Sequence, residues 1–442
     1  MKLFIILLAV FFSYSCSFDD KTGIWKNNNN TIEVEDASVF KDFKNISTTN
    51  SLFNKTITLS EDFEFFLDEP IISKLWVDNF YNKNNNTKNF KYNDLNQIIL
   101  KTKKLTKNKT NNHILFENDN LVINDEKGNI VVYSVDTNSI LTKINFYKKN
   151  YKKVKKNLNL IIENNIIYVT DNIGYMYAYN YAIQKLIWAK KYKVPFRSNI
   201  KISTNKLITS NQNNDLFIFD KLNGNLVKQI PSEETVINNK FINNIAISED
   251  SIFYLNTFGS LYSININSYK LNWFINLNKS LDLSLSNIFS GSDIVYHKEK
   301  ILVSTNEHFY QIDSNSGSVI SKKNYPSLFK PLISNDYYFL ITKNNFLVTL
   351  KPNSDDIIYS FEISQKVADF VGSKKKKLEI KDLMLINSSI FVFLNNAYII
   401  KFNVKGDIEK LVKLPSDLNS KPIIIDSSLL YLNNKNKLYV IN

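Results

Sequence analysis

The stretches GYMYAYNYAIQKLIW (residues 174–188) and GSLYSININSYKLNW (residues 259–273) repeat one pattern 85 residues apart. Each begins at a glycine, continues in a strand rich in tyrosine and isoleucine, and ends in a second strand that finishes with tryptophan. Neither stretch shows the i, i+3, i+4, i+7 spacing of an amphipathic helix, whereas β-branched and aromatic residues are typical of strands. The two copies therefore predict hairpins of a repeated all-β unit.

The same strand ending recurs along the chain at about half that spacing. It consists of an aromatic or aliphatic residue, any residue, a second aromatic or aliphatic residue and, usually, Asn or Asp. The eight copies start at Tyr133, Tyr177, Phe217, Tyr262, Tyr310, Val348, Ile400 and Tyr439. Their mean interval is about 44 residues, with several short strands in each unit, which is typical of a β-propeller. Asn and Asp occupy most turns, where they tolerate left-handed backbone angles in a chain with only 9 glycines.

The last copy ends at Asn442, directly after its third strand. A ring left open there would expose two unpaired sheet edges. The segment LNQIILKTK (95–103) precedes the first complete repeat and can supply the missing strand. We therefore predict an all-β, eight-bladed β-propeller of four-stranded antiparallel blades over residues 71–442, closed by an N-terminal strand that pairs with the C-terminal blade.

The first sixteen residues have the form of an export signal. MKLFIILLAVFFSYSC carries a positive charge at Lys2, ten apolar residues from Leu3 to Phe12, and small residues shortly before Cys16. Ten residues of helix span only about 15 Å, half of a bilayer core, so a cleaved signal peptide over residues 1–15 is expected rather than a transmembrane anchor.

Cys16 is the one cysteine of the chain, so it cannot form an intramolecular disulfide. Its position resembles that of the acylated cysteine of a bacterial lipoprotein, and we predict lipid attachment there. Ser13 and Tyr14 depart from the usual lipobox, and an ordinary signal peptide cleaved nearby is the alternative. Ser17 follows the cysteine, where lipoproteins of the inner membrane typically carry aspartate. The resemblance thus implies the outer membrane, facing the periplasm, with the polar residues 16–70 as a tether.

The repeats, the lipoprotein signal and the opening CSFDDKTGIWK (16–26) together resemble a known family from end to end. The repeat is similar to that of pyrroloquinoline-quinone (PQQ) dehydrogenases and their non-enzymatic relatives, the PQQ-like propellers. The whole chain resembles the BamB family, lipoproteins of the outer-membrane β-barrel assembly (Bam) machine. This resemblance implies a scaffold subunit that binds periplasmic domains of the β-barrel insertase, with nascent outer-membrane proteins as further candidate partners.

A PQQ-dependent dehydrogenase is the first rival interpretation. By the same resemblance, such an enzyme would hold its cofactor between a tryptophan and a vicinal disulfide, with carboxylates on calcium, and this chain has no second cysteine. The sequence also lacks GxSxG, HExxH and CxxC motifs. We therefore predict no enzymatic activity, no catalytic residues, no cofactor and no metal. His113, His297 and His308 receive no role.

The BamB resemblance also implies a partner surface in KVPFRSN (193–199), which follows the strand ending near Trp188. BamB-like proteins carry a short aliphatic-x-aliphatic-Arg motif there, matched by Val194, Phe196 and Arg197. An arginine flanked by apolar residues has the composition of an interface hot spot. The alternative is that Arg197 covers a blade edge or bonds a loop carbonyl.

A neighbouring loop completes the predicted surface. Relatives carry acidic residues there, whereas SNIFSG (286–291) offers Asn287 and Phe289. The electrostatic half of the contact is therefore expected to be lost, or replaced by apolar contact through Phe289.

Charge and tryptophan content add little evidence for other ligands. Lys and Arg exceed Asp and Glu by 13, but Arg197 is the one arginine and the lysines are scattered, so a nucleic-acid partner is not expected. The basic stretches 148–156 and 374–377 are interpreted as solvated loops, and Trp188 and Trp273 as packing between blades. A propeller that binds the cell wall or another ligand is a second rival, because the fold alone would allow it.

Overall fold

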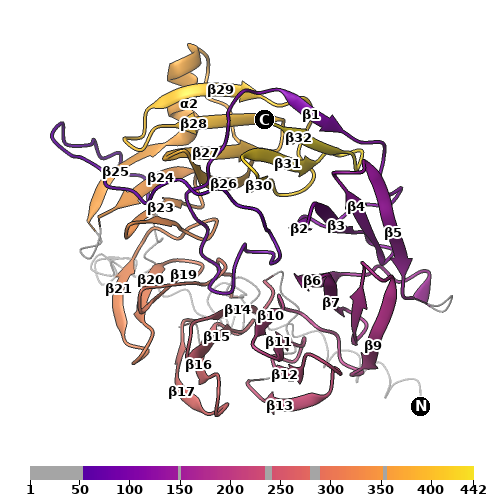
Figure 1. Cartoon of the computed structure of the whole chain (residues 1–442). Coiled ribbons are helices and arrows are strands. Elements are labelled where there is room, and N and C mark those ends of the chain that lie inside the picture. Colours follow the sequence, from indigo (N-terminus) through magenta and orange to yellow (C-terminus); the bar gives the residue numbers. More distant parts are fainter. Residues whose placement is uncertain (1–52, 148–150, 234–240, 279–288, 352–355) are drawn as a thin grey trace, which may run out of the picture. The chain divides into compact units, whose positions relative to one another are not determined.

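The structure is a computed structural model that describes residues 53–147, 151–233, 241–278, 289–351 and 356–442. Residues 52–442 form one compact unit, in which eight four-stranded antiparallel sheets are arranged in a ring (Figure 1). The predicted eight-bladed β-propeller is confirmed. The predicted signal peptide and Cys16 lie outside the described residues.

Each blade runs from an innermost strand to an outermost strand in chain order. Blade 1 contains β2 (Leu115–Glu117), β3 (Asn120–Asn124), β4 (Asn129–Ser134) and β5 (Ser139–Asn145). Blade 2 contains β6 (Leu158–Glu163), β7 (Ile166–Asp171), β8 (Tyr175–Asn180) and β9 (Lys185–Lys191). Blade 3 contains β10 (Lys201–Ser203), β11 (Lys206–Ser210), β12 (Leu216–Asp220) and β13 (Leu226–Ile230). Blade 4 contains β14 (Asn244–Ile247), β15 (Ser251–Leu255), β16 (Ser260–Asn265) and β17 (Leu271–Asn276).

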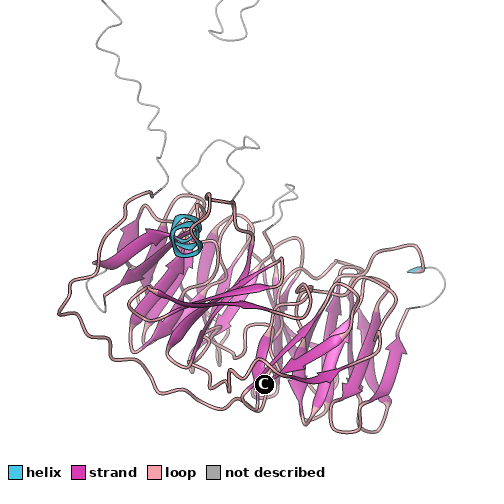
Figure 2. Ribbon diagram, turned by 90° about the horizontal axis from the view of Figure 1, so that it is seen from above, coloured by secondary structure: helices cyan, strands magenta, loops and turns pink. Residues whose placement is uncertain are grey.

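The second half of the ring repeats this order. Blade 5 contains β18 (Val295–His297), β19 (Lys300–Ser304), β20 (Phe309–Asp313) and β21 (Val319–Lys323). Blade 6 contains β22 (Leu332–Ser334), β23 (Tyr337–Ile341), β24 (Phe346–Leu350) and β25 (Ile357–Glu362). Blade 7 contains β26 (Ile380–Ile386), β27 (Ser389–Leu394), β28 (Tyr398–Phe402) and β29 (Ile408–Lys413). Helix α2 (Ile363–Val371) lies between blades 6 and 7 in sequence, on one side of the ring when it is viewed edge-on (Figure 2).

Blade 8 closes the ring with strands from both ends of the described chain. It contains β30 (Ile423–Ile425), β31 (Ser428–Leu432), β32 (Leu438–Ile441) and, outermost, β1 (Ile98–Lys101). β1 pairs antiparallel with β32, and Gln97 and Asn442 exchange two further backbone hydrogen bonds. The predicted closure by residues 95–103 is confirmed.

The burial of each strand explains its sequence. The second and third strands of a blade are buried on both faces because neighbouring blades pack against them. Their sequences are therefore nearly continuous runs of apolar residues. In an outermost strand such as β9, Trp188 alone is buried, and lysines occupy much of the remainder. The turns between first and second strands use the predicted Asn and Asp. Pairs such as Asn164–Asn165 and Asn335–Asp336 have positive φ at both residues, as a type I′ hairpin requires.

Three even-numbered blades dock onto the next blade through one repeated contact. An aromatic side chain of the outermost strand donates a hydrogen bond to a backbone carbonyl of the next blade and packs over a glycine with positive φ. The sets are Trp188 with Lys221 and Gly224, Trp273 with Ser314 and Gly317, and Tyr359 with Val404 and Gly406. The interpretation of Trp188 and Trp273 as packing between blades is confirmed.

The described residues before β1 belong to the same compact unit as the blades. Ile57 exchanges two backbone hydrogen bonds, each of 2.9 Å, with Ser360 in the outermost strand of blade 6. Phe63 and Phe65 then pack against Tyr337 of the same blade. Residues 53–70, part of the tether expected from the sequence, thus contain aromatic side chains that contact blade 6.

Replacing Ile98–Lys101 by Gly-Ser-Gly-Ser should open the ring while keeping the chain length. The new sequence lowers strand propensity, and each ladder hydrogen bond that is lost costs about 0.5–1.5 kcal/mol. We expect a lower unfolding midpoint, a less cooperative transition and soluble oligomers, because the edge of β32 becomes free. Urea unfolding measures the midpoint and the cooperativity, and size-exclusion chromatography detects the oligomers. A single transition at the wild-type midpoint without oligomers would contradict closure by β1.

The Gly317→Ala variant should test the docking contact. An alanine Cβ there would lie 2.6 Å from the Trp273 ring, in addition to the strain of a φ of +74°. Gly372, with φ of +63° and nothing within 4 Å of its added Cβ, provides a matched control. We expect Gly317→Ala to destabilise the fold by about 1–3 kcal/mol more than Gly372→Ala, measured by urea unfolding. Equal losses in both variants would show that backbone strain alone is responsible.

Candidate functional site

Residues 68–93, which we call the plug, occupy the centre of the ring, where Figure 1 shows the indigo part of the chain as a loop surrounded by blades. The plug reaches the eight blades in their order around the ring, through hydrogen bonds to the innermost strands or to residues next to them. The pairs are Trp76–Phe116, Val77–Ile162, Asp78–Lys201, Lys83–Ile247, Asn84–Tyr296, Asn85–Lys330, Phe90–Leu385 and Asn93–Ser427. One short segment therefore links every blade at the axis.

Aromatic and amide side chains hold the plug in place. Trp76, Phe80 and Phe90 are buried, and the rings of Trp76 and Phe90 lie 5.4 Å apart. Asn85 is fully buried, and its Nδ2 lies 2.8 Å from the carbonyl oxygen of Ile294 and 3.0 Å from that of Ile245. These contacts satisfy carbonyl groups of two inner strands or their neighbours that would otherwise face a dry interior.

A buried ion pair joins the plug to blade 3. Lys201 Nζ lies 2.7 Å from Asp78 Oδ2, and both side chains are almost inaccessible to solvent. Burial lowers the pKa of Lys201, while Asp78 opposes this shift. Removing either partner would leave an uncompensated buried charge, which is costly.

Lys330 joins the plug to blade 6 without a carboxylate. Its Nζ donates to the carbonyl oxygens of Asn85 at 2.5 Å and Phe80 at 3.4 Å, and no described carboxylate lies within 4 Å of it. Burial lowers the pKa of Lys330 to about 7, and the positive charge of Lys421 acts in the same direction. Asp293 and Asp382 oppose the shift, and Lys201 adds to it.

The space left beside the plug is small. A cavity of about 20 Å³ lies among Trp76, Phe80, His113, Lys330 and Lys421, together with neighbouring residues. This volume accommodates about one water molecule. A tricyclic quinone cofactor is too large for this cavity. Burial lowers the pKa of His113 in the cavity wall to about 3, so His113 is neutral at physiological pH.

The other histidines have local structural partners. His297 Nε2 lies 2.7 Å from Asp336 Oδ1, in the first turn of blade 6, and its Nδ1 lies 3.4 Å from Asn86 of the plug. Within the described ranges, no three His, Cys, Asp or Glu side chains gather in a way that would hold a metal ion. In the same ranges, no helix is long and apolar enough to cross a bilayer.

The loop predicted to bind a partner is only partly accessible. Phe196 is 3% exposed and packs edge to face with Phe217 and Phe219, so its side chain belongs to the core between blades 2 and 3. Val194 is half-buried. Arg197 is also half-buried, and its Nη2 donates to the carbonyl oxygen of Phe241 at 3.1 Å, the loop-carbonyl contact that was the alternative from sequence. Burial lowers the pKa of Arg197.

In the second predicted loop, the phenylalanine side chain is also buried. Phe289 is 3% exposed and packs edge to face with Phe241, at a ring separation of 5.2 Å. Asn287 lies outside the described residues. Arg197 thus bonds the backbone of Phe241 and Phe289 packs against its ring, so the two predicted loops meet at one half-buried residue. Their role in binding a partner stays a prediction, and any accessible contact in the described part comes from Val194 and Arg197.

The two basic stretches differ in the exposure of their lysines. Lys374 to Lys377 are exposed after α2, and Lys375 pairs with Glu362 at 2.6 Å. In the described part of 148–156, Lys152 and Lys153 are exposed, whereas Lys156 is buried and donates to the carbonyl oxygen of Tyr151.

No model of a protein family and no curated protein matches this sequence. The eight-bladed propeller has counterparts among solved structures. BamB from Moraxella catarrhalis superposes with a TM-score of 0.61 and 11% identity, over 78% of this chain and 100% of that chain. A europium-containing methanol dehydrogenase gives 0.60 and 10%, over 83% and 89% of the two chains. The quinohemoprotein alcohol dehydrogenase from Comamonas testosteroni gives 0.59 and 9%, over 83% and 80%. At these identities the similarity shows the fold alone.

Lys330 should make the stability of the protein depend on pH. Its pKa is about 7 in the folded chain against 10.5 for an unperturbed lysine, so the unfolded chain binds the proton more tightly between these values. The free energy of unfolding should therefore rise from pH 7 to pH 9, and the rise should be smaller in Lys330→Met. Urea unfolding at several pH values measures the slope. The exposed Lys374→Met variant is the control, and equal slopes in all three proteins would contradict the assignment.

Proposed function

We propose that this protein is a non-enzymatic interaction subunit of an outer-membrane β-barrel assembly machine. It is anchored in the outer membrane through a lipid on Cys16, faces the periplasm, and binds periplasmic domains of the insertase to assist insertion of outer-membrane proteins. The export signal with its single cysteine and the end-to-end sequence resemblance to BamB support this role. The fold is compatible with it.

The plug supports the proposal that this protein is not an enzyme. A propeller dehydrogenase needs room for its cofactor, and here Trp76, Phe80 and Phe90 fill the axis, leaving a cavity of about 20 Å³. The chain also lacks the second cysteine that the sequence resemblance to PQQ dehydrogenases would require. Both observations favour a protein that acts through its outer surfaces.

Co-purification tests the proposal. The full chain, tagged at its C-terminus and extracted from membranes with mild detergent, should bring down the β-barrel insertase. Cys16→Ala should lose membrane association, because the lipid supplies the anchor. Arg197→Ala should weaken binding to the insertase's periplasmic domains by about 1–3 kcal/mol, which is roughly 5- to 150-fold.

Lys185→Ala changes an exposed residue on β9, the strand that precedes the loop of Arg197. It is the control and should bind as wild type. Sedimentation with murein without recovery of the insertase would overturn the Bam role and favour a wall-binding propeller. If the insertase is recovered but a folded Arg197→Ala variant binds within twofold of wild type, the predicted loop is not the interface.

A further inference from the structure

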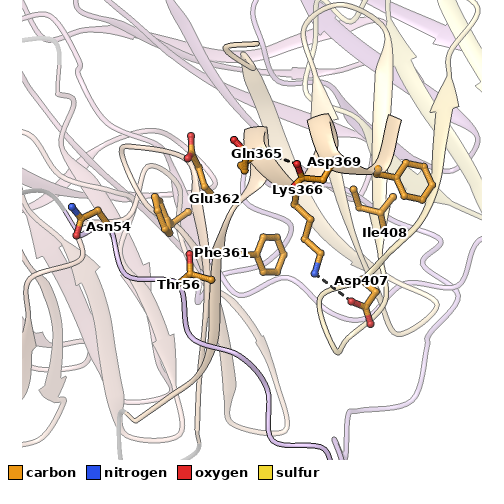
Figure 3. A pocket seen from close by; sticks show the side chains of 11 residues that line it. Asn54, Thr56, Phe361, Glu362, Gln365, Lys366, Asp369, Asp407 and Ile408 are labelled. Atoms are coloured by element: carbon orange, nitrogen blue, oxygen red, sulfur yellow. Dashed lines mark hydrogen bonds and ion pairs between the residues drawn. The ribbon is translucent and has the colours of Figure 1, made fainter. Parts of the chain in front are cut away.

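A trough runs along the outer side of blade 6, between residues 54–61 and helix α2. It consists of two adjoining cavities of about 690 and 450 Å³. Thr56, Phe361, Lys366 and Asp407 line both cavities, so the two form one continuous surface, which we call the edge trough. Figure 3 shows its wider part, with Lys366 reaching from α2 toward Asp407 beside Phe361.

One wall of the edge trough is the segment 56–61, in which Ile57 forms an isolated antiparallel bridge with Ser360. Ile57 directs both its backbone hydrogen bonds to Ser360 of β25. Because neighbouring residues of a strand direct their N–H and C=O groups to opposite sides, those of Thr56 and Thr58 point away from blade 6. Both residues are exposed, and their backbone groups have no hydrogen-bond partner among the described residues. Such an edge is a template for another strand.

The edge trough is acidic, although the chain as a whole carries a net charge of +13. Its lining contains four carboxylates and two lysines, namely Glu61, Glu362, Asp369 and Asp407 with Lys366 and Lys405. Of these carboxylates, Glu362 is also paired with Lys375, which lies outside the lining. Lys366 Nζ pairs with Asp407 at 3.2 Å, and the Asp407 side chain is 69% exposed. Pairs this exposed contribute little, so a cationic ligand can displace the lysine.

Apolar surface lies next to these charges. The Phe361 ring is covered by Lys366, whose Nζ lies 4.3 Å from the ring centroid. Phe370 and Val371, at the end of α2, are 52% and 49% exposed. Apolar and acidic groups therefore lie together in the edge trough, which suits a segment that carries both apolar and cationic side chains.

We propose that the edge trough binds an extended segment of a partner protein, with alternating apolar and Lys or Arg side chains, as an added strand beside residues 54–61. At about 3.3 Å per residue, a seven-residue strand beside this segment would be roughly 23 Å long. The inference rests on the described residues and is independent of the Bam role.

A labelled peptide provides the probe. The purified full chain should bind fluorescein-tagged Val-Lys-Val-Arg-Val-Lys-Val, measured by fluorescence anisotropy. Replacing its cations by Glu should weaken binding at least tenfold, because like charges then meet in the trough. Methylating its backbone nitrogens at alternate residues should have a similar effect, because the methyl groups block strand pairing. Equal binding of all three peptides would overturn the proposal.

Variants of the protein locate the site. Thr58→Pro removes one N–H from the open edge and should weaken binding at least tenfold, whereas Thr58→Ala, which keeps that N–H, should bind within twofold of wild type. Asp407→Asn should weaken binding, and Asp136→Asn, in the corresponding turn of blade 1, should not. Lys366→Met keeps the apolar cover of Phe361 and frees Asp407, so it should tighten binding about threefold.

The gain of affinity expected for Lys366→Met cannot result from a loss of folding, so it tests the binding site itself. If Thr58→Pro does not fold, Asp407→Asn and Lys366→Met decide the question. Binding unchanged in both of these variants, at wild-type unfolding midpoints, would overturn the proposal.

Discussion

Pairing of β1 with β32 is the constraint on which the ring depends. Seven blades are built from consecutive strands, but the eighth takes its outermost strand from residues 98–101. This arrangement joins the two ends of the folded chain in one sheet, so opening that blade separates two distant parts of the sequence. It also fixes the path of the preceding residues. The chain passes from blade 6 through the centre of the ring before it reaches β1, and the plug is the part that lies at the centre.

The plug meets the physical requirement created by closure. Eight innermost strands converge on one axis, and their polar groups need partners away from water. The segment from Trp76 to Asn93 supplies them in ring order, and aromatic side chains fill the remaining volume. The burial of the Lys330 ammonium group with no described carboxylate within 4 Å is an unfavourable element of this arrangement, offset by two carbonyl acceptors.

The repeat made the ring predictable, because an aromatic or aliphatic residue every 44 residues or so marks the third strand of every blade. The closure of the ring could be predicted because the last repeat lacks its fourth strand. The packing of Trp188 between blades could be predicted because Trp188 lies on an outermost strand. The plug was not predictable, because a segment that meets a different blade every few residues has no period. Nor was the burial of Phe196 and Phe289, since a local motif does not reveal that Phe217 or Phe241 lies opposite. Cys16 and Asn287 lie outside the described residues.

Departures from the repeat are the places where one blade of this ring differs from the other blades. The longest interval, from Val348 to Ile400, contains α2 and the exposed lysines that follow it. Without the helix, the groove beside Phe361 would lack the wall that Gln365, Lys366 and Asp369 provide. Without residues 54–61, blade 6 would end at β25, as its neighbours end at their fourth strands. Both insertions meet at one blade, and neither is needed to close the ring. Their conjunction is therefore better explained by recognition of another chain than by stability.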